Sequence, residues 1–104
     1  MVLEKMNYKV VFHPDAAKDL KKLNQRVKIL VFKQINKLSF SPELGKSLGA
    51  KHGIDLTGYR KIYADKKRIR IVYKIQNELV LVQILAVGKR EGMEVYQEAA
   101  KRDL

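Results

Sequence analysis

The 104-residue chain contains no cysteine and only two histidines, His13 and His52. The absence of cysteine excludes a disulfide framework, a thiolate nucleophile and a thiolate metal site, and a metal site would need carboxylates. We therefore expect a protein without a metal or other cofactor. Long apolar runs are also lacking, because the longest uncharged stretch, residues 79–88, is far shorter than the roughly 20 residues that span a bilayer. No basic-then-apolar leader opens the chain, so we expect a cytoplasmic protein with no membrane partner.

Acidic residues are scarce relative to basic ones. There are 22 Lys and Arg against 11 Asp and Glu, a formal net charge of +11. Such a charge favours a polyanionic partner, namely nucleic acid, an acidic protein or an anionic surface. The length predicts one domain over residues 1–104, in which residues 1–5 are either an upstream start or a loose tail before a second methionine, Met6.

Apolar periodicity predicts one strand, two helices, three strands in a meander and a final helix. A glycine-rich loop is expected between the second helix and the meander, and His13 beside Pro14 is expected to cap the first helix. The expected order is strand 8–12, helices 14–24 and 27–39, loop 43–58, a period-two pattern that begins at Leu56 and gives one strand up to residue 64 and another over 68–73, strand 79–87, and helix 91–102. This order predicts an α+β fold with a small, mainly antiparallel sheet.

The first two meander strands carry a basic face. Apolar alternates should face the helices, so Lys61 and Tyr63 on one strand should lie beside Arg68 and Arg70 on the next. Residues 46–70 hold eight Lys or Arg against two Asp, which is 8 − 2 = +6 of the total charge. The sequence therefore predicts a cationic concavity on this face of the sheet.

Arg90 and Tyr96 follow the last strand and are expected at the rim of the same concavity. Clustered cations can hold a phosphodiester and stabilise the charge of its transition state, while a tyrosine can stack on a base or transfer a proton. The 2'-hydroxyl of RNA can itself be the nucleophile, so RNA cleavage needs neither a metal nor a protein nucleophile. Without a His pair, the groups that remain are a lysine whose pKa is lowered by neighbouring cations, a tyrosine, or an arginine that acts as a charge clamp.

The same segments resemble a known family. Gly58 to Ile62, Arg68 to Tyr73, and the Val87-Gly88-Lys89-Arg90-Glu91 ending followed by Glu94-Val95-Tyr96 are similar to the RelE branch of the RelE/ParE toxin superfamily. This resemblance implies a RelE-like fold and a toxin of a type II toxin-antitoxin system. It further implies a metal-independent endoribonuclease that cleaves messenger RNA in the ribosomal A site, leaving a cyclic phosphate and a 5'-hydroxyl.

The resemblance also assigns site residues by position. The family's catalytic set falls on Lys61, Arg70, Arg90 and Tyr96. Arg70 and Arg90 would bind the scissile phosphate, and Tyr96 would stack on or orient the nucleotide. RNA-binding roles are expected for a further basic and aromatic set: Lys46, Lys51, Tyr63, Lys66, Lys67, Arg68 and Lys89.

Tyr63 departs from the family, which has a second lysine at this position. In the family, that lysine has been considered a proton acceptor. Either Tyr63 substitutes for it, or Lys66 or Lys67 does, or the acid-base roles are distributed differently. A weakened or inactive member is also conceivable.

The resemblance implies a RelB-like antitoxin, the ribosome and messenger RNA as partners, with operator DNA bound only through the antitoxin complex. Two other functions remain open. A ParE-like toxin would inhibit DNA gyrase without catalysis, and a non-enzymatic RNA-binding protein would use the same charge. Each of these residues also has a purely structural interpretation. Tyr96 could be a packing residue, Lys61 and Arg70 could be solvated strand positions, and His52 could be a solvated loop residue.

Overall fold

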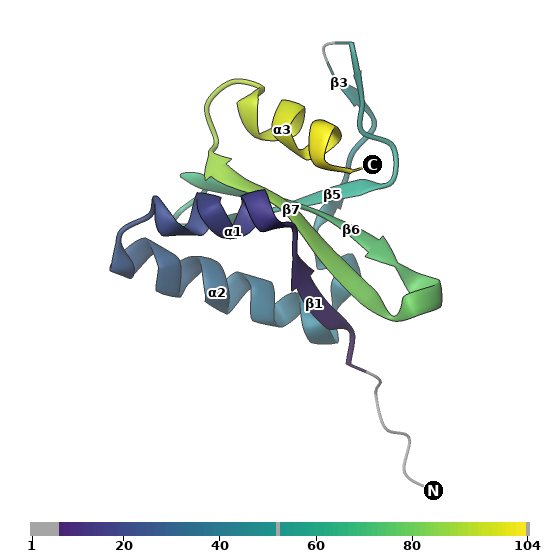
Figure 1. Cartoon of the computed structure of the whole chain (residues 1–104), viewed down its shortest axis with the longest axis horizontal. Helices are drawn as coiled ribbons and strands as arrows, with labels where there is room; N and C mark the ends of the chain where they lie inside the picture. The colour runs from purple at the N-terminus through teal and green to yellow at the C-terminus, as the bar shows by residue number, and fades with distance from the viewer. Residues whose placement is uncertain (1–6, 52, 104) are drawn as a thin grey trace, which may run out of the picture.

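The computed structural model describes residues 7–51 and 53–103, except for the side chain of Lys51. In this part of the chain, α1 and α2 cover one face of a five-stranded sheet and α3 covers part of the other (Figure 1). The elements are β1 (Lys9–Phe12), α1 (Pro14–Lys21), α2 (Gln25–Phe40), β2 (Lys46–Ser47), β3 (Ala50–Lys51), β4 (Ile54–Asp55), β5 (Tyr59–Ala64), β6 (Ile69–Gln76), β7 (Leu81–Lys89) and α3 (Glu94–Arg102). The expected tail, residues 1–5, and His52 lie outside the described residues. No helix in the described ranges is long and apolar enough to cross a membrane.

The sheet has the strand order β1-β7-β6-β5-β2, with β1 parallel to β7 and the other pairs antiparallel. β6 and β7 are interior strands, which agrees with the apolar character of β7 on both faces. The α+β class and the predicted order of the main elements are confirmed.

Side-chain caps set the helix boundaries. His13 is the N-cap of α1, where its Nδ1 accepts a hydrogen bond of 3.0 Å from the Asp15 amide, as predicted. The first helix ends at Lys21 rather than near residue 24 as expected. The reason is that Asn24 is the N-cap of α2, and its Oδ1 accepts a bond of 2.9 Å from the Val27 amide. A short connection therefore folds α2 back along α1.

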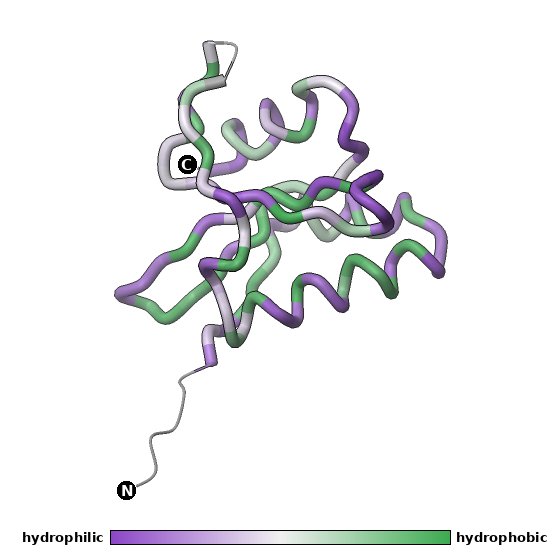
Figure 2. Tube along the Cα trace, turned by 180° about the vertical axis from the view of Figure 1, so that it is seen from behind, coloured by the Kyte–Doolittle hydropathy of each residue, from purple (hydrophilic) through white to green (hydrophobic). Residues whose placement is uncertain are grey.

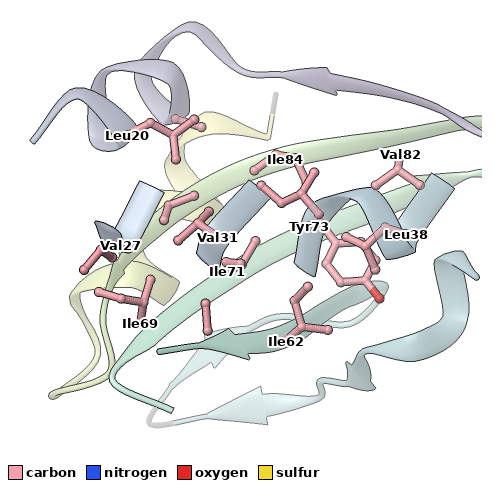
Figure 3. Close-up of a cluster of buried hydrophobic side chains, with 14 residues drawn as sticks. Leu20, Val27, Val31, Leu38, Ile62, Ile69, Ile71, Tyr73, Val82 and Ile84 are labelled. Atoms are coloured by element: carbon pink, nitrogen blue, oxygen red, sulfur yellow. The ribbon is translucent and has the colours of Figure 1, made fainter. Parts of the chain in front are cut away.

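The main core lies between the sheet and the pair α1 and α2 (Figure 3). Its labelled members are Leu20, Val27, Val31, Leu38, Ile62, Ile69, Ile71, Tyr73, Val82 and Ile84. The buried Tyr73 hydroxyl donates to the Pro42 carbonyl at 2.7 Å and accepts from the Gly45 amide at 2.8 Å. These two bonds satisfy the buried hydroxyl. They also fix the segment after α2 against the sheet, because both bonding partners lie in that segment.

The opposite face, expected to carry a cationic concavity, is also partly apolar, because α3 builds a second core there. Buried members of this core are Leu48, Leu56, Tyr59, Val72, Leu85, Ala86, Val95, Tyr96 and Ala99. Arg68 also differs, since it lies in the turn before β6 rather than on the strand. Three residues of this turn, Asp65, Lys66 and Lys67, have positive φ and reverse the chain before β6 begins. The cationic region is therefore limited to the part of the face beyond α3.

The segment expected as a loop, residues 43–58, contains three short strands. β2 extends the sheet by pairing with β5, and β3 and β4 form a separate two-stranded hairpin. Strands of two residues carry no hydrophobic periodicity, so the sequence pattern does not reveal them. The pairing of Lys46 with Lys61 brings this segment to the edge of the cationic region.

Candidate active site

Arg70 lies at the centre of a cluster formed by β5, β6 and α3. It is the direct partner of Tyr63 in the antiparallel register, so both side chains project from the same face. The guanidinium carbon of Arg70 is 4.3 Å from the centre of the Tyr96 ring and 5.9 Å from that of Tyr63. Arg70 Nη1 donates to the Gly92 carbonyl at 3.2 Å, in the segment between β7 and α3. Tertiary packing thus brings together residues that are far apart in the sequence.

Tyr63 is the point on which the other cations converge. Lys61, two residues earlier on β5, donates from Nζ to the Tyr63 hydroxyl at 2.8 Å. The Arg90 guanidinium lies 5.6 Å from the Tyr63 ring centre, and the Arg90 amide donates to the Arg68 carbonyl at 3.0 Å. Tyr63 is therefore in contact with three cationic side chains from three different segments.

These neighbours change the acidity of the tyrosine. The hydrogen bond from the Lys61 ammonium, helped by the Arg70 guanidinium and opposed by partial burial, lowers the pKa of Tyr63 to about 8. In turn, the pKa of Lys61 is raised, chiefly by the Tyr63 hydroxyl and then, against partial burial, by Tyr96. Of the two groups, the Tyr63 phenol is therefore the one whose pKa moves toward neutral pH.

α3 and the preceding segment close over Arg70, which is only 8% exposed, and Tyr96 is 2% exposed. Within the part of the chain that the structure describes, the buried Arg70 Nε has no hydrogen-bond partner. One face of the Tyr96 ring is occupied by Arg70, so its role in stacking on a base stays a prediction.

An open groove of about 1050 Å³ runs from Tyr63 to α2. Six lysines line it: Lys33, Lys37, Lys46, Lys61, Lys66 and Lys67. The sequence analysis predicts RNA-binding roles for Lys46, Lys66 and Lys67, and these roles stay predictions; it does not single out Lys33 and Lys37, which line the same groove. Lys33 and Lys37 are four residues apart, so they lie on the same face of α2. The sequence periodicity does not show that this face borders β5. Figure 2 shows hydrophilic residues at the turn between β5 and β6 and in the segment between β7 and α3.

A second groove, of about 730 Å³, lies on the other side of that turn and is lined by Arg68, Lys89 and Arg90 among others. Arg26 binds Asp65 there, with 3.0 Å between Nη1 and Oδ1, and its guanidinium lowers the pKa of the carboxyl. The acidic residue is thereby neutralised, which leaves a net positive lining. The side chain of Lys51 lies outside the described residues, so its predicted role stays a prediction.

The chemistry of the site is that of cations and phenols. Among the described residues, no three His, Cys, Asp or Glu side chains form a group that could hold a metal ion. Lys61, Tyr63 and Arg90 border solvent, while Arg70 lies beneath Tyr96. Such an arrangement can bind a phosphodiester and stabilise negative charge that develops on it.

Comparisons with known proteins identify the family. Residues 10–93 match the family model described as the ParE toxin of the type II toxin-antitoxin system parDE. The messenger-RNA interferase toxin RelE of Escherichia coli (strain K12) is 34% identical over 102 residues, covering 95% of this chain and all of that protein.

Solved structures agree with this match. An arginine-to-alanine double variant of E. coli toxin RelE in the free state superposes with a TM-score of 0.75 at 32% identity, covering 95% of this chain and 100% of that one. The toxin-antitoxin complex RelBE2 of Mycobacterium tuberculosis has a chain with a TM-score of 0.67 at 32% identity, covering 81% of this chain and 99% of that one. The chain therefore belongs to the RelE/ParE superfamily of toxins from type II toxin-antitoxin systems.

Proposed function

We propose that this protein is a toxin that inhibits translation as a ribosome-dependent messenger-RNA endoribonuclease. Its similarity to RelE interferases extends over nearly the whole chain. The observation that carries the proposal is the cluster of Lys61, Arg70 and Arg90 around Tyr63, because a gyrase-binding toxin has no need of a phosphate site. The lysine-lined groove that leads to this cluster supports a nucleic-acid substrate.

In the proposed reaction, the RNA 2'-oxygen attacks the adjacent phosphorus and the 5'-oxygen of the next nucleotide leaves. Arg70 and Arg90 bind the phosphate and stabilise its transition-state charge, and the Lys61 ammonium adds to this field. Tyr96 keeps the Arg70 guanidinium in place through the ring contact of 4.3 Å and orients the nucleotide. The absence of a His pair does not prevent this reaction, since positioning and charge stabilisation contribute much of the rate.

The test is primer extension on a messenger RNA in a reconstituted translation reaction, with and without ribosomes. Wild type should give cuts within A-site codons that require ribosomes. Arg90→Ala should lower the cleavage rate by about 10²–10³-fold, as expected for losing one donor to the transition state. Arg90 is exposed, so the variant should fold, and the thermal unfolding midpoint checks this. Lys18→Ala on the exposed face of α1, away from the site, is the matched control for loss of one positive charge.

Inhibition of DNA gyrase is the second candidate function, because the matching family model describes the ParE toxin. A gyrase supercoiling assay distinguishes the two functions. Intact messenger RNA together with inhibited supercoiling would replace the first proposal by the second. Cleaved messenger RNA without an effect on gyrase is the expected result.

We further propose that a cognate antitoxin inhibits the protein. Solved E. coli structures include a RelBE toxin-antitoxin complex and a RelE variant bound to a peptide of antitoxin RelB. On this chain, α2 presents the exposed apolar side chains Ile29 and Phe32 among basic residues, which suits an amphipathic acidic segment. Binding to operator DNA would require that complex. A ribosomal target implies action in the cytoplasm.

A further inference from the structure

Tyr63 occupies a position where the resembling family has lysine, and it is the residue on which Lys61, Arg70 and Arg90 converge. We propose that Tyr63 acts as a phenolate general base, taking the proton from the attacking 2'-hydroxyl of the RNA. This inference rests on the proposed endoribonuclease function. It assigns the proton transfer to a residue type different from lysine.

The same cationic field activates a lysine and a tyrosine by opposite routes. Neighbouring positive charges disfavour an ammonium ion, so they would make a lysine at this position a neutral amine. They favour a phenolate, because that ion is negative and can accept a hydrogen bond from an ammonium. In this chain the Lys61 Nζ is in place to donate that bond, at 2.8 Å from the Tyr63 oxygen. Both residue types would therefore supply a base near neutral pH.

The groups that face Tyr63 come from each element packed against it. Lys61 lies on the same strand, Arg70 on β6 and Arg90 beyond β7. Tyr96 on α3 interacts with Lys61 and Arg70. Lysines of the adjoining groove add positive charge on the solvent side: Lys33, Lys37, Lys46, Lys66 and Lys67. The carboxylate of Asp65, which follows β5, is bound by Arg26. The balance around the phenol is cationic, and this agrees with a pKa lowered to about 8.

The proposed proton transfer balances without a further reactant. The Tyr63 phenolate oxygen takes the 2'-hydroxyl proton, and its remaining lone pairs keep the bond from Lys61. The 2'-oxygen then forms a bond to phosphorus, while the bond from phosphorus to the 5'-oxygen breaks. The leaving oxygen keeps the bonding electron pair and takes a proton from water. The products are a cyclic phosphate and a 5'-hydroxyl, and Tyr63 later returns its proton to solvent.

The first test needs no RNA and follows phenolate absorbance of the folded protein against pH. Wild type should show one tyrosine that ionises near pH 8. This step should vanish in Tyr63→Phe and remain in Tyr8→Phe. Tyr8 is a suitable control because it lies far from Tyr63. It directly precedes β1, the edge strand on the opposite side of the sheet, and its hydroxyl donates a hydrogen bond to Asn77. A wild-type titration without this step would overturn the proposal.

The second test is single-turnover cleavage on ribosomes at saturating toxin, as a function of pH. The wild-type rate should rise with pH and level off above about 8. Tyr63→Phe should lose about 10²–10⁴-fold in rate, the usual contribution of a general base, with unchanged ribosome affinity. Tyr63→Lys should recover most of the rate, because it replaces one base with another.

The outcomes separate the two proposals. If wild type cleaves and Tyr63→Phe cleaves equally with the same pH profile, the general-base assignment is wrong and the endoribonuclease function stands. If Tyr63→Phe loses rate only through weaker ribosome binding, Tyr63 is a binding residue and the assignment is again wrong. If wild type itself fails to cleave at any pH, the endoribonuclease function fails, and the general-base assignment fails with it.

Discussion

The ion pair between Arg102 and Asp19 joins the end of α3 to α1. Arg102 Nη1 lies 2.7 Å from Asp19 Oδ2 and also donates to the Leu85 carbonyl at 2.9 Å. The same carboxylate oxygen accepts from the Val87 amide at 3.0 Å. The two side chains are only 10% and 15% exposed. Three segments of chain, α1, β7 and α3, therefore meet at one largely buried pair, which holds α3 in the position that places Tyr96 over Arg70.

Asp19→Asn should destabilise the fold strongly. The variant keeps the shape of the side chain, but it leaves the Arg102 charge buried without its main partner, which costs about 3–5 kcal/mol. Glu98, 3.6 Å from Arg102 and 48% exposed, offsets part of this loss. We therefore expect the lower end, about 3 kcal/mol. At about 4–8 °C per kcal/mol for a domain of this size, Tm should fall by about 12–24 °C.

Urea denaturation of a double-mutant cycle measures the coupling. The singles are Asp19→Asn and Arg102→Met, and the double variant leaves neither charge unpaired. The double should be more stable than the sum of the singles by about 2 kcal/mol or more. Lys101→Met, which removes a 3.8 Å pair to Glu98 from a 75% exposed side chain, is the control and should change stability by less than about 1 kcal/mol. Additive singles, or an Asp19→Asn loss below about 1 kcal/mol, would refute the reasoning.

Three further predictions concern the fold and the site. Gly45→Ala should lower the free energy of unfolding by about 1–3 kcal/mol in urea, because the added Cβ would meet the Lys61 carbonyl at 2.7 Å and the Tyr73 hydroxyl; an unchanged midpoint would contradict this. Asn24→Ala should cost about 1 kcal/mol in the same assay through loss of the α2 cap, and an effect near zero would show that the cap adds nothing. Lys61→Met should raise the pKa of Tyr63 from about 8 toward the ordinary 10.0, measured by phenolate absorbance. The pKa of Tyr63 is lower in the folded wild type than in the unfolded chain, so the free energy of unfolding of wild type should rise relative to that of Lys61→Met as pH rises from about 8 to 10. The gain should disappear when the pH is lowered again. A difference in stability that does not depend on pH would contradict the lowered pKa.

Some features of the fold were predictable because their signals are local. His13 was expected to cap the first helix, and the structure confirms this. Asn24 was expected only as the end of the first helix, but it is the N-cap of the second. The apolar run of β7 predicted an interior strand, and the sheet order confirms it. β2 was missed because two residues carry no period, and only the edge of β5 gives them a partner. The second core under α3 was missed because strand alternation does not say what covers the second face.

The sequence by itself determined the positive charge, the order of the main elements and the family, since composition, periodicity and motif residues are all readable along the chain. It also placed Lys61, Tyr63 and Arg70 on one face, because side chains alternate along a strand. Only the tertiary structure decided the rest. The β5–β6 register set Tyr63 opposite Arg70, and the return of α3 placed Tyr96 over that guanidinium. The acidity of Tyr63 depends on distances to charges from separate segments, and such distances exist only once the chain has packed.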